Sequence, residues 1–279
     1  MRTEGSLATR ARNTLDEALI NEKGWTRIRA AEALIALGQQ ERVRALFESE
    51  LPASENTPER VGVWRILATT VPTSKRADWI ARMERTFLEP SSPDRLQAIE
   101  SLCKLNYVLR GRTLEEARKM ERTLPRAEAL FALWALCLAG EKGSLARLAD
   151  SLDSPEVQVR RRTGLVLRWI APPDQRIRQK LARAIEAEPL DTAASPFLLS
   201  AGLWLKLDPA RAGIWRSRLE DALALGPANV RFEACQTLMR IYTVNDLPRI
   251  AMYLRDPDGE TRIGAAWTVL FVGAGKTGD

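Results

Sequence analysis

The strongest constraint on the fold is an internal repeat with a period near 34 residues. Seven copies begin with arginine, have a short side chain three positions later and end on leucine or valine seven positions later. One degenerate copy has Phe197 in place of the arginine, and consecutive copies are 31 to 37 residues apart. Repeats of this length indicate units that bury their apolar faces against neighbouring units. The eight copies are Arg27–Leu34, Arg60–Leu67, Arg95–Leu102, Arg126–Leu133, Arg160–Leu167, Phe197–Trp204, Arg231–Leu238 and Arg262–Val269.

The residues around the motif indicate that each unit is a pair of helices. Three copies follow a serine or threonine, a proline and an acid, a combination that favours a helix start. Further helical segments lie between the copies, and none shows the sustained alternation of a strand. The sequence therefore predicts an all-α chain of about eight helix pairs. The segments between copies are Glu41–Leu51, Lys75–Leu88, Ser144–Leu152, Asp174–Glu188, Ala210–Leu225 and Asp246–Leu254.

The arginine-led second helix, its paired alanines and the aspartates before it (Asp153 and Asp256) resemble HEAT repeats of the armadillo-like α-solenoid family. The resemblance covers about residues 24–273 and implies a right-handed α-α superhelix, or solenoid. It also implies a ladder in which the arginine joins the preceding aspartate, expected here for Asp153 with Arg160 and Asp256 with Arg262. Because Phe197 breaks the series, we expect a change of curvature near residues 189–209.

We expect one domain over residues 1–279, with an N-terminal helix or cap at 1–23, repeats at 24–273 and a flexible tail at 274–279. The last repeat ends in an apolar stretch with no polar cap behind it. Since repeat arrays need capped ends, we expect either a longer natural chain or self-association through this repeat, at Trp267 and Phe271.

Composition argues against catalysis and against bound cofactors. The chain has no histidine, which excludes catalytic triads, general bases and metal sites that depend on a histidine side chain. Its three cysteines are widely spaced and read as small core residues. We therefore expect a non-enzyme without metal or cofactor. No apolar run approaches a membrane span, and no signal peptide stands out, so we expect a cytoplasmic protein. A chain whose export signal had been removed would look the same.

Positions two, five and nine after each motif arginine should face the concave side of the stack. Most copies place polar or small residues there, but the middle copies place large apolar ones. Such a strip with basic flanks would suit a partner segment. The alternative is that superhelical twist turns these residues into the core. The candidate residues are Phe131, Arg162, Leu165, Trp169, Leu199 and Lys206.

The net charge of +6 is concentrated between residues 160 and 183, where eight basic residues face one acid. This patch could hold phosphates or an acidic partner, or it could be a solvated helix face in an arginine-rich chain. Its candidate members are Arg161, Arg162, Arg168, Arg176, Arg178, Lys180 and Arg183.

These observations favour a non-catalytic scaffold that binds a protein segment on its concave face. The alternative is a DNA-binding HEAT-like solenoid, similar to the alkylpurine DNA glycosylases, that uses the basic patch. A pigment-handling role like that of the bilin lyases rests on fold analogy alone.

Overall fold

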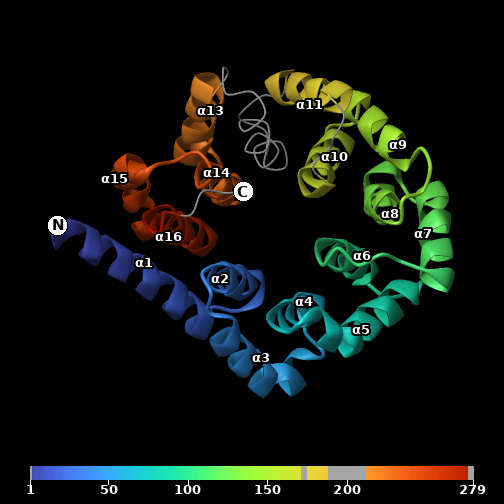
Figure 1. Cartoon of the computed structure of the whole chain (residues 1–279), viewed down its shortest axis with the longest axis horizontal. Helices are drawn as coiled ribbons and strands as arrows, with labels where there is room; N and C mark the ends of the chain where they lie inside the picture. Colours follow the sequence, from blue (N-terminus) through green and yellow to red (C-terminus); the bar gives the residue numbers. More distant parts are fainter. Residues whose placement is uncertain (1, 171–174, 188–211, 276–279) are drawn as a thin grey trace. The chain divides into compact units, whose positions relative to one another are not determined.

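A computed structural model describes residues 2–170, 175–187 and 212–275, and within these ranges the chain forms helices and no strand (Figure 1). The predicted all-α class is confirmed. Each of the seven arginine-led copies falls in a helix. Three predictions lie outside the described residues: the degenerate copy at Phe197, the change of curvature at 189–209, and the binding residues Leu199 and Lys206. The helices are α1 (Arg2–Asn21), α2 (Gly24–Ala36), α3 (Gln40–Ser54), α4 (Arg60–Thr70), α5 (Ala77–Leu88), α6 (Arg95–Lys104), α7 (Gly111–Thr123), α8 (Arg126–Leu138), α9 (Ser144–Asp150), α10 (Val157–Ile170), α11 (Gln175–Ala187), α13 (Ala212–Leu225), α14 (Ala228–Leu238), α15 (Leu247–Ala251) and α16 (Gly259–Gly273).

The chain divides into two compact units, where the sequence suggested one domain. The central unit comprises residues 39–172, and the terminal unit comprises residues 1–38 together with 173–279. Each unit is described by itself.

The central unit is a two-layer stack of helix pairs. The arginine-led helices α4, α6, α8 and α10 contact one another in that order and form one layer, while α5 contacts α7 in the other (Figure 1). Within each pair the two helices also pack together, as in α5 with α6 and α7 with α8. Each pair therefore covers the apolar face of the next, as the repeat predicts.

The terminal unit brings the two ends of the chain together. Helix α16 packs against α14 on one side and against α1 and α2 on the other (Figure 1). The N-terminal pair thus occupies the place of the next repeat after the C-terminal one. The sequence shows no polar cap after the last repeat, but within the terminal unit α1 and α2 pack against α16. Trp267 and Phe271 are half-buried within the unit itself, and the packing gives no support to self-association through them.

Burial follows the repeat. Every third-position and seventh-position residue of the motif within the described ranges is buried. Burying a leucine of this kind stabilises the fold by roughly 1.5–3 kcal/mol. The short residues let neighbouring helices approach, and the long ones fill the seam. These residues are Ala30, Val63, Ala98, Ala129, Thr163, Ala234 and Ala265, with Leu34, Leu67, Leu102, Leu133, Leu167, Leu238 and Val269.

The motif arginines link one helix pair to the next. Arg60 Nε lies 2.8 Å from Asp94, Arg231 Nη2 lies 2.9 Å from Asp256, and Arg262 Nη2 lies 3.4 Å from Glu22. In each case the acid lies just before the arginine-led helix of the neighbouring pair. The last contact places α1 and α2 in the same relation to α16 as a following repeat.

At Asp256 the contacts differ from the ladder implied by the HEAT resemblance. The Asp256 carboxylate accepts from Arg231 of the preceding pair, and Arg262 instead donates to the Asp256 carbonyl at 2.9 Å. Arg160 donates to the carbonyls of Ser154 and Pro155, both at 2.9 Å. Each guanidinium therefore binds the backbone at the end of its own first helix, which positions it to reach the next pair.

Candidate functional site

Helix α10 presents three of the predicted residues on one face. Arg162, Leu165 and Trp169 lie three and four positions apart, a spacing that aligns side chains along a helix. Trp169 is 43 % exposed, and its ring centroid lies 6.0 Å from that of the buried Trp134 on α8. The Arg168 guanidinium lies 5.7 Å from the centre of the Trp169 ring. We call Arg162, Leu165, Arg168 and Trp169 the α10 surface.

Phe131 is not part of this surface. The predicted exposure of its ring is wrong, since Phe131 is only 7 % exposed. The Arg162 guanidinium lies 5.5 Å from the ring centre, and Arg162 Nη1 donates to the Ala127 carbonyl at 2.9 Å. Arginine stacked in this way covers an aromatic face and gains a cation–π contact. The alternative interpretation, in which the residue belongs to the core, holds for Phe131.

The basic patch is distributed over both units. Arg161 is buried at 5 % exposure, which corrects its assignment to a solvent-facing patch. Arg162 and Arg168 belong to the α10 surface of the central unit. The remaining members lie on α11 of the terminal unit, where Arg176 and Arg183 are exposed and Arg178 and Lys180 are half-buried.

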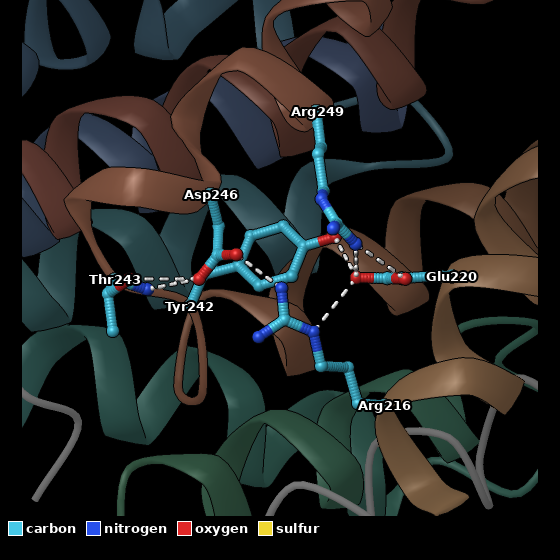
Figure 2. Close-up of polar contacts among 6 residues, drawn as sticks. All are labelled: Arg216, Glu220, Tyr242, Thr243, Asp246 and Arg249. Atoms are coloured by element: carbon cyan, nitrogen blue, oxygen red, sulfur yellow. Dashed lines mark hydrogen bonds and ion pairs between the residues drawn. The ribbon is translucent and has the colours of Figure 1, made fainter. Parts of the chain in front are cut away.

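A second polar cluster lies where α13 meets the segment after α14 (Figure 2). Glu220 accepts from Arg216 at 3.0 Å, from the Tyr242 hydroxyl at 3.2 Å and from Arg249 at 3.1 Å. Asp246 accepts from the Thr243 amide at 2.9 Å and from its hydroxyl at 3.0 Å, and it also pairs with Arg216. The cluster therefore holds α13, the loop after α14 and α15 together.

Electrostatics fix the charge states in this cluster. Burial and the nearby Glu220 carboxylate raise the pKa of Tyr242, so its hydroxyl stays a donor. Burial opposes ionisation of Asp246, but the hydrogen bonds from Thr243 and Arg216 outweigh it and lower its pKa. The central unit has a related contact, in which the Tyr107 hydroxyl donates to Glu84 at 3.1 Å. In both units a tyrosine after the second helix binds a glutamate on the first, which identifies the contact as a brace between helices.

A third charged set lies at α2, α14 and α16 of the terminal unit. Arg29 pairs with Glu32 at 3.2 Å and lies 5.1 Å from the centre of the Phe232 ring. Burial opposes the charged form of Arg29, but Glu32, Glu233 and Glu260 outweigh it and raise its pKa. Burial raises the pKa of Glu260, and Arg29 opposes that shift. The set neutralises a half-buried guanidinium.

The cysteines carry no nucleophile. Cys103 and Cys235 are fully buried and Cys137 is half-buried. Burial raises the pKa of all three thiols, and a hydrogen bond from Ser144 only partly offsets the shift at Cys137. The thiolate is the reactive form of cysteine, and burial therefore favours the less reactive thiol form of all three side chains. The described residues bring no group of three or more cysteine, aspartate and glutamate side chains into a metal-holding arrangement. Judged by length and hydropathy together, none of the helices in the described ranges could span a bilayer.

Two cavities of the central unit are lined by residues that already bind other residues of the protein. The one between α5 and the loop after α6 has a volume of about 640 Å³ and includes Glu84 and Tyr107, which bind each other. The one between α4 and α5 has a volume of about 500 Å³ and includes Arg60 and Arg82. Arg60 is paired with Asp94 and Arg82 with Glu55. These three contacts of Glu84, Arg60 and Arg82 join neighbouring helices or the loops beside them.

Arg162, Leu165 and Trp169 share one face of α10, as their spacing predicts, and their place on a concave binding surface stays a prediction. Sequence reasoning missed that the buried Trp134 ring lies beside that of Trp169. The apolar run of α8 could have suggested this, because a tryptophan in such a run packs against the next arginine-led helix. No protein-family model matches the chain, and no curated protein sequence is significantly similar to it. Function is therefore argued from geometry.

Proposed function

We propose that this protein is a non-catalytic scaffold of HEAT-like, solenoid-type helix pairs that binds an acidic segment of a protein partner on the α10 surface. The observation that carries the proposal is the exposed Trp169 ring, supported by Trp134 and flanked by arginines. Tryptophan and arginine are the residues most enriched at binding hot spots. An indole held against a second ring also loses little freedom when a partner covers it.

Charge determines which partner would fit. The Arg168 guanidinium lies 5.7 Å from the centre of the exposed Trp169 ring, so an acidic partner residue next to an apolar one could contact both. Such pairing favours acidic segments and disfavours basic ones through like-charge repulsion. The expected ligand is a segment with acidic and aliphatic or aromatic residues in alternation.

Binding of an array of short acidic–apolar peptides tests the proposal. Trp169→Ala should weaken the tightest peptide about 30-fold, in line with a hot-spot loss near 2 kcal/mol. Trp25→Ala is the matched control, because Trp25 is exposed to a similar degree (37 %) and lies on α2 of the terminal unit. Equal affinities for the wild type and the Trp169→Ala variant would refute the α10 surface as the binding site.

DNA binding is the alternative, and the geometry favours it less. Arg161 is buried, and Arg162 contacts Phe131 and the Ala127 carbonyl. Fewer guanidinium groups are therefore directed to solvent than the sequence suggested. Binding to duplex DNA that weakened steeply with salt and with loss of Arg176 and Arg183 would favour this alternative over the scaffold.

A further inference from the structure

Among the arginine-led copies, Arg126 differs from the other six arginines, each of which has a hydrogen-bond or ion-pair partner. Arg60, Arg95, Arg231 and Arg262 each pair with a carboxylate of the neighbouring helix pair. Arg126, at the start of α8, has no hydrogen-bond or ion-pair partner among the residues that the structure describes, and it is exposed. In those four helix pairs the chain itself supplies a carboxylate to the motif arginine, and for Arg126 it does not.

Arg126 lines a cavity of about 370 Å³ between α7, α8 and α9. Its apolar wall consists of Leu124 from the end of α7 with Ala129, Leu130 and Leu133 of α8. This volume is within the range of small-molecule sites, which combine apolar walls with a few placed polar groups.

The other charged groups of the cavity have partners. Arg147 Nε lies 3.1 Å from Glu121, and its Nη2 lies 3.6 Å from Glu141. The Ser151 hydroxyl donates to the Arg147 carbonyl at 3.0 Å. Arg126 is thus the lining guanidinium that a ligand could engage without breaking a contact of the fold.

We propose that this cavity binds a small aliphatic carboxylate, whose carboxyl group pairs with Arg126 as Asp94 pairs with Arg60 and whose hydrocarbon chain lies on the half-buried Leu124. Arginine binds a carboxylate through two parallel N–H donors, which fixes its orientation. A phosphate dianion fits less well, because it has no hydrocarbon part for the apolar wall and because Glu121 and Asp150, which also line the cavity, repel two charges more strongly than one. The inference is independent of the α10 surface.

Titration with hexanoate at constant ionic strength, followed by NMR chemical shifts of the full chain, tests the site. Hexanoate should shift the amides of α7, α8 and α9, whereas hexanol, which lacks the charge, and inorganic phosphate, which lacks the chain, should bind at least tenfold more weakly. Arg126→Gln should weaken hexanoate binding at least tenfold, and Arg126→Lys should retain part of it. Arg122→Gln is the control, because Arg122 is exposed on α7 and does not line the cavity.

Three results would overturn the proposal. Equal binding of hexanoate and hexanol would show that Arg126 is not engaged, and unchanged affinity in Arg126→Gln would show the same. Binding of a blocked Leu-Glu-Leu peptide without binding of hexanoate would assign the carboxylate to a partner side chain and not to a small acid. Because Arg126 is exposed, the variants should fold normally, and circular dichroism checks this.

Discussion

At the scale of single residues, arginine joins neighbouring helix pairs because one guanidinium can bind backbone and carboxylate together. Arg231 donates to the Gly226 carbonyl at 3.2 Å while its Nη2 lies 2.9 Å from Asp256. Its five N–H donors are arranged in a planar fork, whereas lysine presents a single ammonium group. A lysine at this position could hold one of these contacts well, but not both. This explains why the repeat begins with arginine.

Asp246 links pH to the stability of the terminal unit. Its pKa is lowered in the folded state, so it stabilises the fold above the pKa of an unfolded aspartate, and this contribution is lost as the pH falls through the folded value. Asp246→Asn should cost about 1–3 kcal/mol at neutral pH, because the charged acceptor of Arg216 is removed. The variant should also lose less stability than the wild type between about pH 5 and pH 2. Urea unfolding across this range measures both effects.

The control for this prediction is Asp221→Asn. Asp221 is exposed on α13, one residue from Glu220 and outside the cluster of Figure 2. Its replacement should leave the stability within about 0.5 kcal/mol of the wild type. If Asp246→Asn retained the full acid sensitivity of the wild type, Asp246 would not be the residue responsible.

At the scale of elements, the helix starts show where local sequence signals are insufficient. Two of the serines that precede a proline and an acid before a motif copy are Ser92 and Ser154, and this combination favours a helix cap. Their hydroxyls instead accept from the amides of Asp94 and Glu156, two residues on, at 3.3 and 3.2 Å. Such bonds define a turn that precedes the helix. α16 is capped differently: the Asp258 carboxylate accepts from the Thr261 amide at 2.7 Å.

Replacement of these residues should separate the two kinds of helix start. Asp258→Ala should destabilise the protein by about 1 kcal/mol, because a first-turn amide of α16 loses its acceptor. Ser92→Ala should cost less than half as much, since only a long turn bond is lost. Thermal unfolding of both variants measures the difference. Equal costs would mean that Ser92 caps α6 in solution as the sequence suggests.

The sequence predicted the helices and their buried seam well, because both follow from local periodicity. Ala98 and Leu102 occur at the spacing that any stacked helix must bury. Contacts between pairs were less predictable. The burial of Phe131 depends on Arg162, an arginine on the next arginine-led helix, and the partner of Asp256 depends on which pair precedes it. The spacing of apolar residues around Phe131 or Asp256 therefore predicts neither the burial of the ring nor the partner of the carboxylate.

At the scale of the whole molecule, the order of pairs in space differs from their order along the chain. In the terminal unit the arginine-led helices α14, α16 and α2 pack in succession, although α2 is near the opposite end of the sequence. The contact between Arg262 and Glu22 spans 240 residues. No periodic pattern could have predicted it, since the repeat describes neighbours along the chain and treats each end as open.

The stability of α16 should therefore depend on α1. Ala11, Leu15 and Leu19 of α1 are fully buried, and α1 packs against α16. Leu15→Ala should destabilise the protein by about 3 kcal/mol through lost burial and the cavity left behind. Because α16 loses cover, its amides should exchange with solvent faster together with those of α1, as expected when a local unit opens as one. Hydrogen exchange detected by mass spectrometry resolves this segment.

Leu225→Ala is the matched control, since Leu225 is 85 % exposed on α13 and its replacement should change neither stability nor exchange. If Leu15→Ala left the exchange of α16 unchanged, α1 would not be its cover in solution, and the two ends of the chain would be energetically independent.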